Sequence, residues 1–310
     1  MWHDDLASRI HSAAWDRVAT LFGTRLPRTD VTARLAALTA LARSHWDFRL
    51  GGERSDLGND LWFDSRSAAI VVDAAAELDM VHSTRAAADR YDGVIVPGGA
   101  GHAPLRRLTY ALEQRIECAW IAMLGSDRMV TDEERVRSDL YAPAARTEFD
   151  LMSAAVEVSS GRSSSEDVML AAGYEHAPGT TARLRRYHGD PGPVSSAPVW
   201  CLSAPAPAGR TRAATEHTFE LLSAVASQVL HPFSRLLVVT NALYAPYQHM
   251  HALRVLTAST GARVDVAGFS AGHFGHEVRL SPVLLLQEMK SYVDSMWRFT
   301  LGAGSVELAA

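Results

Sequence analysis

One stretch decides the fold: Asp92-Gly-Val-Ile-Val-Pro-Gly-Gly-Ala-Gly101, a short apolar strand that runs directly into a glycine turn. Residues 104–115 follow with helical spacing, so together they predict a strand–turn–helix unit. A glycine backbone can come close to a ligand, and N–H groups at the start of a helix attract negative charge. Gly98, Gly99 and Gly101 are therefore candidates for binding a small anionic ligand, although a purely structural tight turn explains them equally well.

The alternation of strands and helices continues downstream of this unit. Further apolar strands are expected at 119–124, 199–203, 236–240 and 264–267, with helices at 149–158, 168–172, 215–229, 246–257 and 281–299 and a loop at 189–198. Strands that are apolar on both faces and separated by helices are typical of a parallel sheet covered on both sides. The sequence therefore predicts an α/β protein with a three-layer, Rossmann-like, mainly parallel sheet.

The first part of the chain has a different pattern. Apolar residues recur there at three-to-four spacing, which indicates helices, and a polar, Gly-rich stretch at 51–56 interrupts them. We expect an N-terminal helical extension, 1–88, followed by one Rossmann-like α/β domain, 89–310.

The composition argues against several classes of protein. The net charge is only −5, and no stretch combines basic and aromatic residues as a nucleic-acid surface does. No apolar run reaches the ~18 residues that a membrane span needs, and the N-terminus is acidic, so we expect a cytoplasmic protein without membrane contact. Lys290 is the only lysine, which excludes a P-loop. Cys118 and Cys201 are expected to be buried, reduced thiols.

In an open parallel sheet, ligands bind beyond the carboxyl ends of the strands. After the second strand, Arg128 offers a bidentate donor for an anion. Thr147 and Asp150 have the spacing of a helix capping box, which leaves Glu148 between them unexplained by capping. Glu148 is therefore a candidate for a functional carboxylate.

Two later segments carry further candidates. In the helix from 215, His217, Thr218 and Glu220 lie close together, although acids in a first turn normally complement the helix dipole. At the end of the expected strand 236–240 and just after it, four hydrogen-bonding residues stand close together in the sequence: Thr240, Tyr247, Gln248 and His249.

The spacings His249-x-His251 and His273-x-x-His276 could suggest a metal centre. Residues two apart on a helix point about 200° from each other, however, so we expect no metal site.

The motifs at these strand ends, taken in order, resemble those of the bacterial family typified by YdcF, SanA and ElyC. The resemblance rests on five segments: Asp92–Gly99, Gly125–Arg128, Thr147–Met152, His217–Glu220 and Val238–Leu253. The chain would be a divergent member, because it has His217, Leu221, Gln248 and His251 where that family has Asn, Asn, His and Arg. The resemblance implies a Rossmann-like fold and, for some members, S-adenosylmethionine binding or a role in envelope metabolism. The missing N-terminal span argues against the envelope role.

Two functions remain open. The first is an enzyme of hydrolase or group-transfer type acting on a small polar or anionic metabolite, for which a nucleotide-like molecule is one option. In it His217 or His249 would serve as general acid or base, Glu148 and Glu220 as orienting or base carboxylates, and Arg128 as anion clamp. The alternative is a non-catalytic protein that binds S-adenosylmethionine or a nucleotide. The expected partner is a small molecule, and a homo-oligomer is left open. Besides the three glycines, the ligand-binding set is Arg128, Thr218, Thr240, Tyr247 and Gln248.

Overall fold

The structure is a computed structural model that describes residues 2–48, 63–169, 182–189, 196–230, 233–275 and 280–302. The chain divides into two compact units. The first comprises Met1–Thr84, Asn241–Met250 and Gly268–Ala310, and the second comprises Arg85–Thr240 and His251–Ala267. Within the described ranges, no helix is both long enough and apolar enough to span a membrane.

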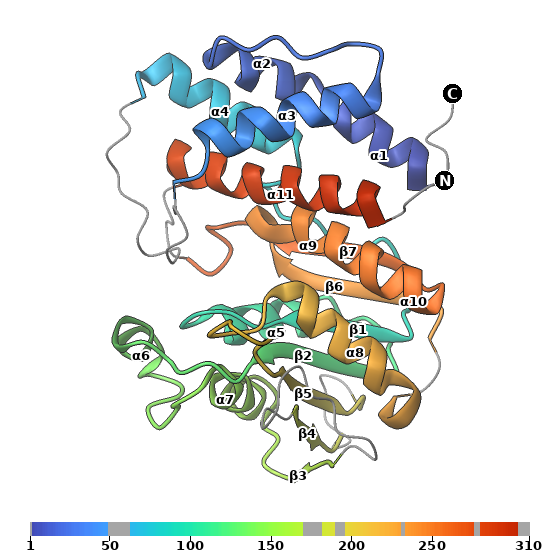
Figure 1. Cartoon of the computed structure of the whole chain (residues 1–310). Helices are drawn as coiled ribbons and strands as arrows, with labels where there is room; N and C mark the ends of the chain where they lie inside the picture. The colour runs from blue at the N-terminus through green and yellow to red at the C-terminus, as the bar shows by residue number, and fades with distance from the viewer. Residues whose placement is uncertain are drawn as a thin grey trace. The chain divides into compact units, whose positions relative to one another are not determined.

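The first unit is built mainly from helices (Figure 1). They are α1 (Trp2–Ile10), α2 (Ala13–Leu21), α3 (Val31–His45), α4 (Ser65–Glu77) and α11 (Pro282–Gly302). The side chains of Ser12, Asp30 and Asp64 accept backbone N–H groups and so cap α2, α3 and α4. The expected helical extension is thus present.

The C-terminal helix α11 belongs to this helical unit. It packs against α3 and α4, and the ring of Tyr292 lies 5.9 Å from that of Trp15 in α2. Trp15 also stacks on Trp46 at 6.5 Å. The compact units therefore differ from the expected division at residue 88, because buried aromatic rings from both ends of the chain form one helical core.

The second unit contains a sheet whose order is β3-β4-β5-β2-β1-β6-β7. Its strands are β1 (Gly93–Pro97), β2 (Trp120–Ser126), β3 (Ser165–Asp167), β4 (Arg183–Tyr187), β5 (Val199–Ala204), β6 (Arg235–Asn241) and β7 (Arg263–Phe269). β1 pairs in parallel with β2 and β6, and β2 with β5, whereas β4 is antiparallel to β3 and β5. Every residue of β1, β2 and β5 is buried, as a sheet covered on both faces requires.

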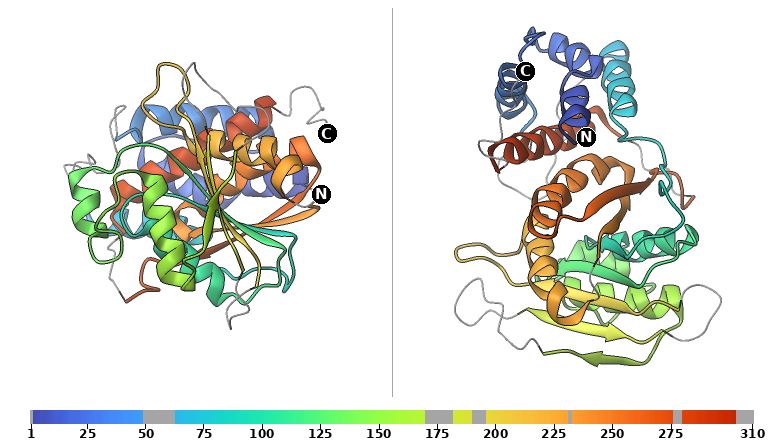
Figure 2. Two further views of the ribbon diagram at one scale, coloured as in Figure 1. Left: turned by 90° about the horizontal axis from the view of Figure 1, so that it is seen from below. Right: turned by 90° about the vertical axis from the view of Figure 1, so that its right-hand side faces the viewer.

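Helices cover both faces of this sheet (Figure 2). On one face α5 (Ala103–Glu113) packs against α7 (Glu148–Ser160), and on the other α8 (Thr215–Val229) packs against β5 and β2. The short α6 (Asp132–Ser138) lies between β2 and α7 in the sequence. The helix expected at 246–257 consists of α9 (Ala245–Ala252) and a π-helical turn (Leu253–Thr257), followed by α10 (Ala258–Thr260). The predicted three-layer α/β fold is confirmed.

The strands β3 and β4 differ from the sequence prediction. A helix was expected from residue 168, but the Val168 N–H donates to the Leu184 carbonyl and continues the strand pairing. Both strands are polar, so no apolar alternation marks them. They are joined instead by ion pairs such as Arg185 with Asp167 at 2.7 Å. Parts of three other expectations lie outside the described residues: the 51–56 interruption, the rest of the 168–172 helix and most of the 189–198 loop.

Candidate functional site

Two glycines lie side by side where β1 and β2 end. Pro97 pairs with Leu124, which places Gly98 opposite Gly125, and Gly125 pairs in turn with Ser203 of β5. Paired residues of parallel strands point to the same face of the sheet. Gly98, Gly125 and Ser203 therefore form a row at the carboxyl edge of the sheet. Two of these three positions have no side chain on the face that α7 covers.

The side chains of α7 fill those two positions. A methyl group on Gly98 would lie 2.6 Å from Glu148 Oε1, and one on Gly125 would lie 2.8 Å from the Met152 methyl carbon. Both distances are too short for real contacts, so both glycines are needed for α7 to approach the strands. The first residue of α7, Glu148, thus rests its carboxylate directly on the strand ends.

The two oxygens of the Glu148 carboxylate have different surroundings. Oε2 accepts hydrogen bonds from the Ser126 hydroxyl at 2.6 Å and the Ser126 N–H at 3.2 Å, and lies 3.4 Å from Arg128 Nε. Oε1, which faces Gly98, accepts no hydrogen bond from any residue that the structure describes. Glu148 is only 7% exposed. The site therefore presents one oxygen of a largely buried carboxylate in a fixed orientation.

Arg128 connects this carboxylate to α6. Its Nη1 and Nη2 bind the two oxygens of Glu134 at 2.7 and 2.6 Å. Burial alone raises the pKa of Glu134, but hydrogen bonds from Arg128 and Thr131 outweigh burial and bring this pKa below its usual value. The guanidinium expected to clamp an external anion is thus directed at two carboxylates of the chain. Thr147 and Asp150 form the expected capping box beside Glu148.

The glycine turn is held by its carbonyl groups. Buried Arg107, on the inner face of α5, donates from Nη1 to the carbonyls of Pro97 and Gly98. The Tyr141 hydroxyl donates to the Gly101 carbonyl at 2.6 Å, and burial raises the pKa of that hydroxyl. The φ angles of Gly99 and Gly101 are +151° and +53°. The sequence reasoning missed Arg107 and Tyr141. The available signal was an arginine on the apolar face of the 104–115 helix.

The three candidates on α8, His217, Thr218 and Glu220, have different surroundings. His217 accepts the Ala214 N–H through Nδ1 at 2.9 Å, and the Thr218 hydroxyl donates to the carbonyl one turn earlier. Glu220 makes no hydrogen bond or ion pair with any residue in the described ranges. Its neighbour Glu216 instead binds Arg254, with Nη2 2.7 Å from Oε2, and lies 3.9 Å from Nδ1 of His251.

The candidates around β6 fall into different units. Thr240, at the buried end of β6, belongs to the second unit, and its hydroxyl finds no hydrogen-bond partner among the described residues. Tyr247, Gln248 and His249 belong to the first. There the Gln248 side-chain amide donates to the Tyr247 hydroxyl at 3.4 Å, and His249 is buried.

No group of three or more potential ligands is arranged to hold a metal ion in the part of the chain that the structure describes. His276, one of the four histidines with the spacing of metal ligands, lies outside the described residues.

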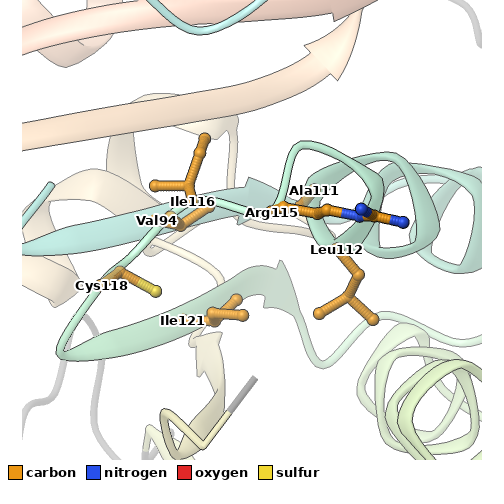
Figure 3. A pocket seen from close by; sticks show the side chains of 7 residues that line it. All are labelled: Val94, Ala111, Leu112, Arg115, Ile116, Cys118 and Ile121. Carbon is orange, nitrogen blue, oxygen red and sulfur yellow. The ribbon is translucent and has the colours of Figure 1, made fainter. Parts of the chain in front are cut away.

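A pocket lies at the opposite, amino-terminal end of β1 and β2 (Figure 3). Its lining is Val94, Ala111, Leu112, Arg115, Ile116, Cys118 and Ile121. It has room for about one water molecule, which is too little for a metabolite. Cys201 is buried as expected, whereas Cys118 is only partly buried. Burial raises the pKa of the Cys118 thiol to about 11 and that of Cys201 to about 12, so both thiols stay protonated at neutral pH.

Comparisons with known proteins show similarity to a different group of proteins from the one expected. Residues 3–79 match the family described as the Rv3785 N-terminal domain. The chain is 27% identical over 316 residues to the "Uncharacterized protein Rv3785" of Mycobacterium tuberculosis, an alignment that covers 94% of this chain and 85% of that protein. The "Uncharacterized protein Mb3814" of Mycobacterium bovis matches to the same extent. No solved structure matches the chain significantly.

The resemblance to the YdcF, SanA and ElyC family is therefore wrong. The family match falls on the N-terminal helices, which lay outside that resemblance, and the similar proteins are Rv3785 proteins. The physical reason is that apolar strands ending in glycine and helices starting with capping residues are common to parallel α/β sheets in general. The suggestion of S-adenosylmethionine came from that resemblance and loses its support with it.

Proposed function

We propose that this chain is an enzyme of hydrolase or group-transfer type that acts on a small polar or anionic metabolite at the carboxyl ends of β1 and β2. The observation that carries the proposal is the state of Glu148: Oε2 is held by Ser126 and faces Arg128, whereas Oε1 has no donor in the described chain. Glu148 as a whole is only 7% exposed, so water has little access to this oxygen, and a ligand hydroxyl or a bound water is its natural partner.

The surroundings of Glu148 fit a ligand that carries negative charge as well as a hydroxyl group. Arg107 and Tyr141 hold the carbonyls of the glycine turn. The Gly98 N–H donates to the Leu124 carbonyl, whereas the N–H groups of Gly99 and Gly101 have no backbone acceptor among the described residues and are suited to an anion. No side chain caps the start of α5, and Pro104 occupies its first turn. Glu148 then accepts a hydrogen bond or a proton from the metabolite, and the turn binds its anionic group.

A binding protein without chemistry is the second candidate. The rigid fixation of Oε2 by Ser126 favours it, because a carboxylate held in this way orients a ligand hydroxyl without any proton transfer. A nucleotide, with its ribose hydroxyls and phosphate, would satisfy the same site. The two candidates differ only in whether the bound molecule is changed.

Ligand-dependent melting temperatures test the proposal. The probes are inorganic phosphate, glycerol 3-phosphate, ribose 5-phosphate and adenosine monophosphate, with calorimetry for any that raises the melting temperature. A ligand at 100 times its Kd adds about 2.7 kcal/mol to the free energy of unfolding. Glu148→Gln should abolish the shift. Glu157→Gln is the matched control, because Glu157 is an exposed acid of the same helix.

Turnover of the bound probe, followed by phosphorus NMR, separates the two candidates. Product formation by the wild type supports the enzyme, and binding without product supports the binding protein. Equal shifts in the wild type, Glu148→Gln and Glu157→Gln would contradict both, because the ligand would then bind elsewhere.

A further inference from the structure

A surface arginine of α6 lies against the glycine turn. Arg137 packs the stem of its side chain on Gly101: a methyl group on this glycine would lie 3.2 Å from Arg137 Cβ and 3.6 Å from its Cδ. Tyr141, four residues further on, donates its hydroxyl to the Gly101 carbonyl at 2.6 Å. The segment between β2 and α7 therefore fixes one arginine directly beside the turn.

The charged end of this side chain is open to solvent. The Arg137 side chain is 58% exposed, and its Nη2 pairs with Glu133 one helical turn earlier. An exposed pair of this kind contributes little to stability, because water and salt screen it. Arg128, by contrast, is only 12% exposed, and both oxygens of Glu134 hold its guanidinium. Arg137 can therefore turn from its partner to an incoming anion without disturbing the fold.

The turn itself offers donors on an accessible surface. Gly98 and Gly99 are half-buried and Ala100 is exposed. The N–H groups of Gly99 and Gly101 have no backbone acceptor in the part of the chain that the structure describes. Arg107 adds a positive charge where it binds the Gly98 carbonyl. An anion on this turn therefore meets N–H donors close to a fixed positive charge.

The Glu148 carboxylate lies within reach of the same turn. Glu148 Oε1 faces Gly98, and Arg137 lies against Gly101, three residues further along the chain. Consecutive Cα atoms are about 3.8 Å apart, so these two glycines are separated by at most about 11 Å. One small molecule can therefore contact the carboxylate with a hydroxyl group and the arginine with an anionic group.

We propose that Arg137 binds a phosphoryl group of the metabolite, so that the site selects a small phosphate ester that also carries a hydroxyl group. The hydroxyl donates to Glu148 Oε1, and the phosphoryl oxygens accept from the N–H groups of Gly99 and Gly101 and from the guanidinium. Donors that reach one anion from the turn and from α6 suit the several oxygens of a phosphoryl group. This assignment rests on the proposed function and names its substrate class.

Calorimetry with glycerol 3-phosphate and ribose 5-phosphate tests the role of Arg137. Arg137→Gln keeps the Cβ and Cδ that contact Gly101, and it should raise Kd by about 10- to 100-fold, the range of a lost hydrogen bond to a charged group. Arg135→Gln is the matched control. Arg135 also pairs with an acid of the first turn, Asp132 at 2.7 Å, but it points about 200° away from Arg137 on the helix. This control should leave Kd unchanged within about twofold.

Glu133 provides a test in the opposite direction. Glu133→Gln removes the carboxylate that competes for Arg137, so Kd should fall by about twofold. In the Arg137→Gln background the same substitution should have no such effect, because no guanidinium remains to be released. A merely structural role of Arg137 would not give tighter binding in Glu133→Gln, so the absence of this coupling would contradict the assignment.

The corresponding carboxylates, glycerate and ribonate, identify the anion that the site selects. They should bind more weakly than the two phosphate esters, and equal affinities would overturn the phosphoryl group as the selected anion. Equal Kd values for the wild type and Arg137→Gln, with binding still lost in Glu148→Gln, would refute the role of Arg137 while the proposed function stands. A wild type that binds neither phosphate ester overturns this assignment, and one that binds none of the probes named above overturns the proposed function as well.

Discussion

Replacing Gly98 by alanine tests whether the Glu148 carboxylate really rests on the end of β1. The added methyl would lie 2.6 Å from Glu148 Oε1 and 2.9 Å from the Leu124 carbonyl oxygen. The carbonyl belongs to the backbone of β2 and cannot move away, so the carboxylate and the turn must shift. The φ angle of Gly98 lies outside the left-handed region, so the whole effect is steric.

The size of the effect follows from the cost of overpacking. Adding a methyl to a filled site costs about 1–3 kcal/mol, and each kcal/mol lowers the melting temperature by about 2–4 °C in a unit of 150–250 residues. Gly125→Ala should cost less, because its methyl meets the flexible end of Met152. Gly272→Ala has no atom within 4 Å of the new methyl and serves as the matched control with a change near zero.

Scanning calorimetry of the single variants and of Gly98→Ala with Glu148→Ala measures the coupling. Removing the carboxylate takes away the closest contact of the new methyl. Gly98→Ala should therefore cost less stability in the Glu148→Ala protein than in the wild type, by about 0.5 kcal/mol or more. The contact with Leu124 remains and prevents a full rescue. Strict additivity, or a Gly98→Ala variant as stable as Gly272→Ala, would refute the geometry of the Glu148 site.

Three further substitutions or treatments test other parts of the second unit. Tyr141→Phe removes the hydrogen bond to the Gly101 carbonyl and should cost about 0.5–1.5 kcal/mol in urea unfolding, while no loss would show that the turn does not depend on it. Backbone N–H groups lower the pKa of Asp92 below its ordinary value of 3.8, so its stabilisation is complete above that pH and is lost as the pH falls through the lower folded value. Asp92→Asn should therefore be less stable than the wild type at pH 7 and lose less stability on acidification, whereas parallel pH curves would contradict this. Because burial raises the pKa of Cys118 to about 11 and of Cys201 to about 12, both thiols should react with Ellman's reagent far more slowly in the native protein than after unfolding, and rapid native labelling would disprove their protection.

Part of the candidate site was visible in the sequence. Glycines after an apolar strand are a local pattern, and so is a carboxylate left over when the capping box of Thr147 and Asp150 is accounted for. Both led to Gly98 and Glu148. The contact between them could not be predicted, because it depends on the pairing of Pro97 with Leu124 and on the start of a helix some 50 residues away in the sequence.

The histidines also show that contacts between distant residues cannot be predicted from local sequence. His249 and His251 stand two residues apart, and nothing local distinguishes them. The structure buries His249 in the first unit and places His251 beside Glu216, a residue 35 positions earlier in the sequence. Likewise, the polar strand β4 has no apolar signal of its own and is recognisable only from its neighbours β3 and β5.

By itself, the sequence determined the helical N-terminal part, the apolar strands of the parallel core and the caps of its helices, because burial and capping act within a few neighbouring residues. Only the tertiary structure decided that α11 joins the N-terminal helices, that Arg128 faces two carboxylates of its own chain, and that Glu148 keeps one oxygen without a donor among the described residues. Those outcomes depend on strand register and on the packing of segments far apart in the chain, whose energies no local pattern records.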